Sequence, residues 1–350
     1  MKKYRIGVLG PSEIAFRRMV PAIVNSRHFD FAGIAHASLE EYPGQSAGHA
    51  AKCEKFADAF GGKIYDSFAE ILGDADVDAV YIPLPPSEHL KWAKAAFDSG
   101  KHVLVEKPST TTLADTEKMI KAAEAGAAGG QAPCTNGGLS PRALALHENY
   151  AYAYHAQVKA IRDILESGRI GDLRLVRATF SFPYRGENDF RYHADRGGGA
   201  IIDCGGYPVN FVSGFLGEDV RVISSSLLST RGHNVDTYGA ATLTGDNGVI
   251  AQVSWGMDNV YRCGAELHGS TGMISTDRLY SPPASMNPVI TITDNSGVEK
   301  VEVEADDQFE RSLDCFAECI EDSAVAANRR DQILRQAKLI QAIIDNNSER

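Results

Sequence analysis

Residues 102–108 read His-Val-Leu-Val-Glu-Lys-Pro, an apolar run that ends in a charged pair and a proline. The run has the length and composition of a buried strand. The tripeptide Glu106-Lys107-Pro108 follows at its carboxyl end. A lysine at the mouth of a buried strand can face a cofactor and a substrate carbonyl together. The role of Lys107 therefore depends on what surrounds this strand.

Strand and helix patterns alternate through the first part of the chain. Strands are predicted over Tyr4–Gly10, Phe29–Ala37, Ala79–Ile82, His102–Val105 and Ala143–Asn149. Helices are predicted over Ile14–Ser26, Ala47–Phe60, a segment capped by Ser87, and Tyr150–Ser167. This alternation predicts an α/β domain with a parallel sheet covered by helices on both faces. Such sheets bind ligands beyond the carboxyl ends of their strands.

The turn Gly10-Pro11-Ser12-Glu13-Ile14-Ala15 lies at such an end and partly matches a dinucleotide-binding fingerprint. Gly10 takes the first glycine position, Ser12 the second and Ala15 the third. Amides at the helix start, around Glu13 and Ile14, are expected to hold phosphate oxygens. Pro11 removes one amide donor, so an ordinary strand–helix turn is the alternative. The turn after the third predicted strand, with Leu84 and Pro85, lies at the same edge.

The end of the second strand bears on the choice between NAD and NADP. An acid there would bind the ribose 2′-hydroxyl, whereas a basic residue would accept a 2′-phosphate. The strand ends His36-Ala37-Ser38, with neither an acid nor an arginine. Ser38 can bond either form. The sequence leaves NAD and NADP open, and the missing acid favours NADP slightly.

Composition excludes some classes of partner. A formal net charge of −11 argues against a nucleic-acid partner, which needs a basic stripe. No apolar stretch approaches the length of a membrane helix, so no membrane partner is expected. Cys315 and Cys319 are close, but with no Cys or His nearby they favour buried thiols over a metal site. We expect no metal and a reduced, cytoplasmic location.

The glycine-rich stretch 125–141 is predicted to be an insertion loop.

The composition changes after Gly171, where a series of strand patterns begins. They cover Leu173–Pro183, Val220–Thr230, Thr237–Thr244, Val249–Trp255, Ala265–Gly269, Pro288–Thr293 and Glu299–Glu304, with closing helices over Phe309–Asp322 and Asp331–Asp345. Sequential antiparallel strands predict an open sheet in an α+β domain. We expect a dinucleotide-binding domain over residues 1–150. Residues 151–350 are expected to bind substrate and to form a homo-oligomer (dimer or tetramer) through the sheet, with the last helix a candidate to pack back on the first domain.

The segment 197–207 reads Gly-Gly-Gly-Ala-Ile-Ile-Asp-Cys-Gly-Gly-Tyr. This composition is not typical of a segment with a purely structural role. On a helix Asp203 and Tyr207, four residues apart, share one face. Asp203 lies among apolar residues, so it needs a hydrogen bond or an ion-pair partner. The alternative interpretation is a capping aspartate and a core tyrosine.

With these motifs the chain resembles the Gfo/Idh/MocA oxidoreductase family over essentially its whole length. With a tyrosine at position 207, the chain resembles one branch of the family. This branch contains glucose–fructose oxidoreductase, dihydrodiol and xylose dehydrogenases, and nucleotide-sugar ketoreductases. The resemblance implies a dinucleotide-binding domain followed by an open-sheet domain. It implies an NAD(P)-dependent oxidoreductase that transfers hydride between nicotinamide and a sugar, sugar derivative or nucleotide sugar. A non-catalytic dinucleotide-binding regulator and an NAD-dependent glycosidase, both known in the family, are the alternatives.

The resemblance also implies roles for single residues. Tyr207 is the expected acid–base group; a free tyrosine has a pKa near ~10, which a neighbouring ammonium such as Lys107 lowers. Lys107 would also bond the nicotinamide ribose, and its action as the direct proton donor is the competing assignment. Asp203 would orient the substrate hydroxyl or Lys107. The expected cofactor-binding residues are Gly10, Ser12, Glu13, Ile14, Ser38, Leu84, Pro85, His89, Glu106 and Lys107.

The expected substrate-binding residues are Tyr150, His155, Arg191, Tyr192 and Asn210. Arg191 is a candidate to bind a sugar-nucleotide phosphate. A surface ion pair with Asp195 or Glu187 is the alternative for this arginine. A structural role is the alternative for His89.

Overall fold

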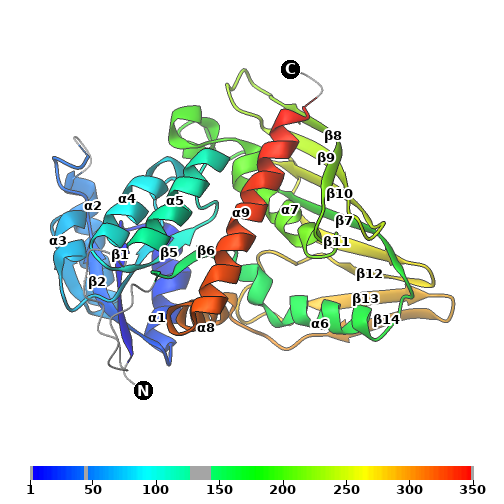
Figure 1. Cartoon of the computed structure of the whole chain (residues 1–350), viewed down its shortest axis with the longest axis horizontal. Coiled ribbons are helices and arrows are strands. Elements are labelled where there is room, and N and C mark those ends of the chain that lie inside the picture. The colour runs from blue at the N-terminus through cyan, green and yellow to red at the C-terminus, as the bar shows by residue number, and fades with distance from the viewer. Residues whose placement is uncertain (1–2, 43–45, 127–142, 348–350) are drawn as a thin grey trace. The chain divides into compact units, whose positions relative to one another are not determined.

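The computed structural model describes residues 3–42, 46–126 and 143–347 (Figure 1). The chain forms two compact units, which we describe separately. The first contains Met1–Asn149 and Phe309–Leu334, and the second contains Tyr150–Gln308 and Arg335–Arg350. The predicted glycine-rich insertion loop falls mostly on residues 127–142, outside the described residues.

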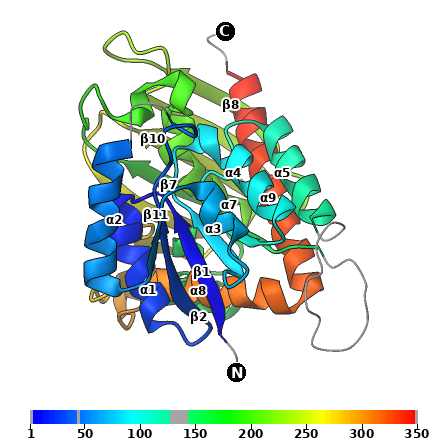
Figure 2. The ribbon, with the colours of Figure 1, turned by 90° about the vertical axis from the view of Figure 1, so that its left-hand side faces the viewer.

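A six-stranded parallel sheet forms the centre of the first unit, with strand order β3-β2-β1-β4-β5-β6. Figure 2 labels two of its strands, β1 and β2. The strands are β1 (Tyr4–Leu9), β2 (Phe29–Ala35), β3 (Lys63–Tyr65), β4 (Ala79–Ile82), β5 (His102–Glu106) and β6 (Leu146–Asn149). The prediction of a parallel sheet is confirmed. The strand order reverses at β1, so the carboxyl ends of β1 and β4 lie at the position where such sheets bind ligands.

Helices pack around this sheet. They are a π-helical turn (Ala15–Met19) that leads into α1 (Val20–Asn25), then α2 (Ser46–Phe60), α3 (Phe68–Gly73), α4 (Pro86–Asp98), α5 (Leu113–Ala125) and α8 (Gln308–Glu321). Phe316 of α8 stacks on Phe29 of β2, with ring centroids 5.5 Å apart, so α8 belongs to this core. The prediction that Ser87 caps a helix is wrong: α4 begins at Pro86, so Ser87 lies inside the helix, and Pro85 takes the N-cap position. Pro86 tolerates this position because the first helical amides have no intrahelical acceptor.

The second unit is built on an eight-stranded sheet with order β14-β13-β12-β11-β7-β10-β9-β8. The strands are β7 (Leu173–Ser181), β8 (Arg221–Leu228), β9 (Tyr238–Thr244), β10 (Ile250–Gly256), β11 (Arg262–Gly269), β12 (Gly272–Thr276), β13 (Val289–Asp294) and β14 (Gly297–Glu302). Neighbouring strands are antiparallel except β7 and β10, which are parallel. The predicted open, mostly antiparallel sheet is confirmed.

The two faces of this second sheet differ. One packs against α6 (Ala156–Glu166), α7 (Gly206–Ser213) and the end of α9 (Ser323–Asp345), which contribute Ile161, Val212 and Ile343 to a shared core (Figure 1). On β7 and β10 the other face carries polar pairs: Thr179 Oγ1 lies 2.9 Å from Ser254 Oγ, and Arg177 Nε donates to Gln252 Oε1 at 3.0 Å. This period-two alternation is what a sheet with one covered face requires.

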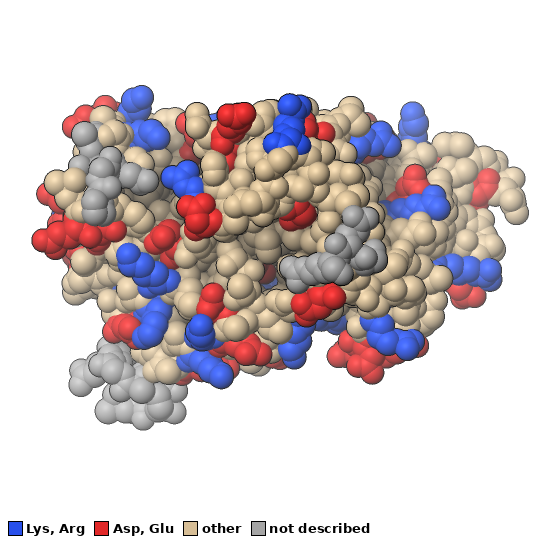
Figure 3. Space-filling view, turned by 90° about the horizontal axis from the view of Figure 1, so that it is seen from above, with Lys and Arg blue, Asp and Glu red and all other residues tan. Residues whose placement is uncertain are grey.

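The surface carries both signs of charge. On the face shown in Figure 3, Lys and Arg side chains are interspersed with Asp and Glu side chains. Among the described residues, no helix combines the length and the apolar character that a membrane crossing requires.

Candidate active site

The turn after β1 has the geometry of a phosphate-binding turn. Gly10 has a φ of +100°, and a Cβ there would lie 2.9 Å from Cδ2 of Leu84. The position therefore requires glycine both for its conformation and for the close approach of the loop after β4. Ala15, at the third fingerprint position, is fully buried. Of the two interpretations of this turn, the requirement for glycine at position 10 favours the dinucleotide fingerprint over an ordinary strand–helix turn.

Ser12 acts as the N-cap of the first helix. Its Oγ accepts from the Ala15 amide at 3.1 Å, and its carbonyl accepts from the Phe16 amide at 3.1 Å. The first amides of a helix have no intrahelical acceptor, so in this part of the described chain those of Glu13 and Ile14 remain to bind an external group. Backbone amides at a helix start favour phosphate oxygens. The turn thus fits the pyrophosphate of a dinucleotide, despite a serine at the second glycine position.

Ser38 lies in a capped turn beyond β2. Its Oγ accepts from the Glu41 amide at 3.2 Å, and Oε2 of Glu41 accepts from the Ser38 amide at 2.8 Å. The same carboxylate accepts from the amides of Phe68 and Ala69, at 3.1 and 3.0 Å, at the start of α3. Glu41 is therefore used to cap α3.

His89 ties two loops together. The residue is fully buried; its Nδ1 lies 2.9 Å from the Pro108 carbonyl and its Nε2 lies 2.8 Å from the Leu84 carbonyl. These contacts hold the loop after β4 against the Glu106-Lys107-Pro108 turn. Two roles were predicted for His89, and this geometry supports the structural one. Direct contact of His89 with a cofactor stays a prediction.

The end of β5 places a largely buried carboxylate beside Lys107. Oε1 of Glu106 accepts from the Tyr81 hydroxyl and from Asn149 Nδ2, both at 2.6 Å. Its Oε2 accepts from the Lys107 amide at 3.3 Å. Burial raises the pKa of Glu106, while these donors act in the opposite direction. The Lys107–Pro108 peptide bond is cis, and the Lys107 side chain is half-buried.

Glu148 is a second buried carboxylate at this strand end. Its Oε1 accepts from the Ser109 amide at 2.6 Å, so it supports the chain just after Pro108. Burial raises the pKa of Glu148 to about 7, and the charge of Lys107 acts to lower it. Sequence reasoning did not assign Glu148 to the site. The register of β6 against β5, which pairs Glu148 with Val105, brings it there.

In the second unit Asp203 forms a buried ion pair. It accepts from Nε of Arg191 at 2.7 Å, while Nη1 of Arg191 contacts both oxygens of Asp189, at 3.0 and 3.2 Å. Burial alone would lower the pKa of Arg191, but the charges of Asp203 and Asp189 outweigh it and raise the pKa above its usual value. The predicted alternative partners, Asp195 and Glu187, are wrong. The 3₁₀ turn at Phe190–Tyr192 brings Asp189 to the guanidinium instead.

Asp203 and Tyr207 do not lie on one regular α-helix. Ile201–Gly205 is a π-helical turn, and α7 begins at Gly206. A Cβ at Gly206 would lie 2.3 Å from the Tyr150 hydroxyl, so glycine is needed for this segment to press against that ring. The predicted capping role for Asp203 is also wrong, because the N-cap position is Ala200.

Aromatic rings surround Tyr207. Its ring centroid lies 5.4 Å from that of Tyr150, 5.0 Å from Phe180 and 5.5 Å from Tyr280, at tilted or edge-on angles typical of favourable aromatic pairs. Tyr150 and Tyr280 are buried, whereas Tyr207 is half-buried. Burial raises the pKa of Tyr280 well above its usual value, which makes it a poor proton donor.

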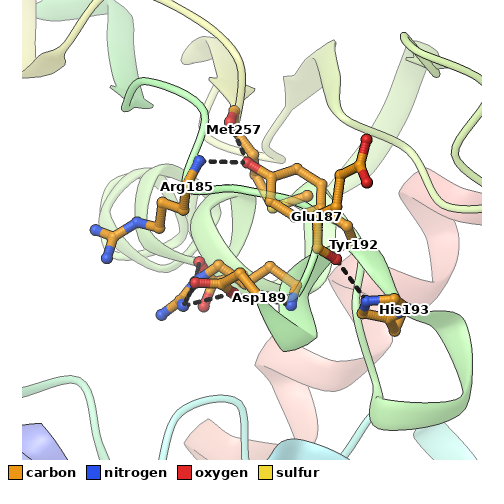
Figure 4. Close-up of polar contacts among 8 residues, drawn as sticks. Arg185, Glu187, Asp189, Tyr192, His193 and Met257 are labelled. Carbon is orange, nitrogen blue, oxygen red and sulfur yellow. Dashed lines mark hydrogen bonds and ion pairs between the residues drawn. The ribbon is translucent and has the colours of Figure 1, made fainter.

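The remaining predicted substrate residues make internal contacts. His155 caps α6, accepting from the Gln157 amide at 3.0 Å, and Asn210 Oδ1 accepts from the Tyr152 hydroxyl at 2.7 Å. The Tyr192 hydroxyl donates to the Met257 carbonyl at 2.6 Å and accepts from the Arg185 amide at 3.2 Å (Figure 4). Gln336 Nε2 lies 3.4 Å from the Tyr150 hydroxyl. Of these residues, Tyr150 and Tyr152 lie against the Tyr207 ring, and direct substrate contact of the predicted set stays a prediction.

Comparison with known proteins identifies the family. Residues 4–128 match the model described as oxidoreductase family, NAD-binding Rossmann fold, and residues 158–275 match the Gfo/Idh/MocA C-terminal domain.

The chain belongs to the Gfo/Idh/MocA family of oxidoreductases.

Its relatives include sugar-nucleotide reductases and sugar dehydrogenases. It is 36% identical to the dTDP-3,4-didehydro-2,6-dideoxy-alpha-D-glucose 3-reductase of Streptomyces violaceoruber, over 98% of this chain and 95% of that one. It is 27% identical to D-xylose 1-dehydrogenase (NADP(+)) 2 of Haloferax volcanii, over 97% of this chain and 96% of that one. The crystal structure of a 3-ketoreductase from Actinomadura kijaniata, in complex with NADP and TDP-benzene, superposes with a TM-score of 0.87. It has 33% identity and covers 99% and 98% of the two chains.

This family member is an NAD(P)-dependent oxidoreductase that acts on sugar derivatives. The turn at Gly10, Glu13 and Ile14 fits the dinucleotide on its own geometry, as described above. When bound, the nicotinamide cofactor supplies the hydride.

We predict that Gly10→Ala weakens NADPH binding by about tenfold or more, because alanine is strained at a φ of +100° and its Cβ would displace Leu84. Gly73→Ala is the matched control, since it ends α3 with no atom within 4 Å of an added Cβ. Nicotinamide fluorescence titration measures both. Unchanged binding by Gly10→Ala would place the dinucleotide elsewhere.

A second prediction concerns the Arg191–Asp203 pair, whose side chains are 21% and 10% exposed. Removing one partner of a buried pair leaves an uncompensated charge, so Arg191→Met should lower the free energy of unfolding by about 3–5 kcal/mol. The control is Arg231→Met, which removes a pair with Asp258 in which the arginine is 57% exposed and should cost far less. Urea denaturation gives both values; equal losses would show that the Arg191 pair is not special.

Proposed function

We propose that this protein reduces the 3-keto group of a dTDP-linked deoxy sugar with NADPH. The observation that carries the proposal is 34–36% identity, over 97–98% of this chain, to four curated enzymes named as dTDP-3,4-didehydro-2,6-dideoxy-alpha-D-glucose 3-reductase. The 3-ketoreductase structure with NADP and TDP-benzene supports the same substrate class and cofactor. The absence of an acid at the end of β2 also supports NADP over NAD.

In the proposed reaction the carbonyl carbon gains hydride and the carbonyl oxygen gains a proton. The Tyr207 hydroxyl gives that proton. Lys107 bonds the nicotinamide ribose and stabilises the resulting phenolate through its charge. Solved structures of the Actinomadura kijaniata enzyme include variants in which a lysine is replaced by alanine or glutamate and a tyrosine by phenylalanine. This choice of residue types supports a lysine–tyrosine pair, and Lys107 as the direct donor remains the competing assignment.

The other predicted residues take supporting roles in this proposal. Asp203, held by Arg191, orients a substrate hydroxyl. Gly10, Ser12, Glu13, Ile14, Ser38, Leu84, Pro85 and Glu106 surround the cofactor. The proposed division is a dinucleotide-binding domain over residues 1–150 and a substrate domain over 151–350, except that Phe309–Leu334 belong to the first unit. The regulator and glycosidase alternatives are not favoured, because the relatives are named as reductases and dehydrogenases.

The activity test follows the nicotinamide absorbance with a dTDP-linked 3-keto sugar, comparing NADPH with NADH and using D-xylose with NADP as the alternative substrate. We expect turnover with the dTDP sugar and NADPH, and a loss of about 10²–10⁴-fold in kcat for Tyr207→Phe, the range that acid–base groups contribute. If Tyr207→Phe is as fast as the native protein while Lys107→Ala is inactive, Lys107 is the donor. Faster turnover of D-xylose would contradict the substrate class.

We further propose a homo-oligomer, a dimer or tetramer, formed through the polar face of the second sheet around Thr179 and Ser254. Light scattering should give a multiple of the single-chain mass, and Thr179→Arg should reduce it by placing like charges opposite one another. A single-chain mass for the native protein would contradict this. A cytoplasmic location is proposed as well, since Cys53, Cys263, Cys315 and Cys319, in the described part of the chain, are reduced thiols.

A further inference from the structure

A series of buried polar side chains connects α8 to the strand end that carries Lys107. Ser312 of α8 is fully buried, and its hydroxyl donates to Asn149 Oδ1 at 2.8 Å. Asn149 Nδ2 in turn donates to Glu106 Oε1 at 2.6 Å. All three residues belong to the first unit, although 163 positions of sequence separate Ser312 from Asn149.

The direction of these hydrogen bonds is fixed by chemistry. A carboxylate only accepts, so Asn149 must present its amide nitrogen to Glu106 and its oxygen to Ser312. The single Ser312 proton is then used, and the hydroxyl accepts from Nε2 of His147, 3.0 Å away. Burial lowers the pKa of His147 to about 3, which favours the neutral ring, and the contact with Ser312 then requires the ring proton on Nε2.

Satisfied polar groups are normal in a core, but this arrangement converges on one acceptor. The Tyr81 hydroxyl donates to the same Oε1 of Glu106, at 2.6 Å. The other oxygen, Oε2, accepts from the Lys107 amide. With Oε1 held from two sides, Oε2 has a fixed direction, and so has the backbone at Lys107. A well-packed apolar core would be about as stable as a buried polar one, so stability alone does not account for the convergence.

We propose that Ser312 and Asn149 are positioning residues, which act through Glu106 to fix the backbone that aims Lys107. The inference rests on the proposed function for the catalytic role of Lys107. The contacts it uses are within the first unit.

The test combines hydrogen exchange of residues 104–110 with steady-state kinetics on the full-length protein. Ser312→Ala removes the hydroxyl, and Ser312→Thr keeps it. Ser225→Ala is the matched control: that serine is also buried, at 3% exposed, and donates to the Ile343 carbonyl at 2.7 Å in the second unit. Ser312→Ala loses the buried bonds with Asn149 and His147, and Ser225→Ala loses a buried bond in the other unit, so both cost buried hydrogen bonding at different places.

We expect Ser312→Ala to speed exchange of residues 104–110 and to lower kcat, each by about tenfold, the effect of losing the one ordinary hydrogen bond that leads through Asn149 to Glu106. Ser312→Thr should restore both. Ser225→Ala should change unfolding stability by a similar amount and leave both readouts unchanged. A role in stability alone would not produce this difference between the two alanine variants.

Each other outcome has a defined meaning. If Ser312→Ala behaves like Ser225→Ala in exchange and kcat, the positioning role is wrong. If exchange of 104–110 quickens but the native protein turns over no nucleotide sugar, the proposed function fails while the positioning of this turn stands. Should Ser312→Ala not fold, Asn149→Asp keeps the side-chain size and removes the donor to Glu106. Unchanged exchange in that variant would equally overturn the inference.

Discussion

The carboxylate of Glu106 is largely buried at the end of β5, and a buried charge is stable only where hydrogen bonds replace its water. Its donors come from β4, through Tyr81, and from β6, through Asn149. Asn149 in turn depends on Ser312 of α8. One buried carboxylate thus requires hydrogen-bonding side chains on three neighbouring elements, β4, β6 and α8. The sheet order, with β5 between β4 and β6, makes this possible.

A buried charge organises the second unit as well. Arg191 holds Asp203 and Asp189, which joins the loop before the glycine run to the π-helical turn. Asp236 also holds the π-helical turn, because its carboxylate accepts from the Ile201 amide at 2.8 Å. Burial raises the pKa of Asp236 to about 6. These contacts fix the start of α7, and with it the position of Tyr207. In both units the residue proposed for chemistry is therefore held by a neighbouring buried carboxylate network.

Sequence patterns predicted the long elements well, because apolar periodicity reports burial along one continuous segment. They missed β3 and β12, which have only 3 and 5 residues, and also α3 and α5. They placed the start of the last helix at Asp331, although α9 begins at Ser323. A strand as short as β3 gives too few residues for a period, but α5, with 13 residues, was missed although its length was sufficient. Helix starts depend on capping contacts such as that of Glu41 with the amides of α3, made across 27 residues of sequence.

The sequence by itself determined the fold class, the family and the candidate pair Lys107 and Tyr207, because these follow from local composition and from motifs with fixed spacing. Only the tertiary structure decided which polar groups meet. Arg191 pairs with Asp203 and Asp189 in place of Asp195 or Glu187, and Glu148, Asn149 and Ser312 join the surroundings of Lys107. Partners of buried charges depend on strand register and helix packing between distant segments, and neither leaves a periodic signal in the chain.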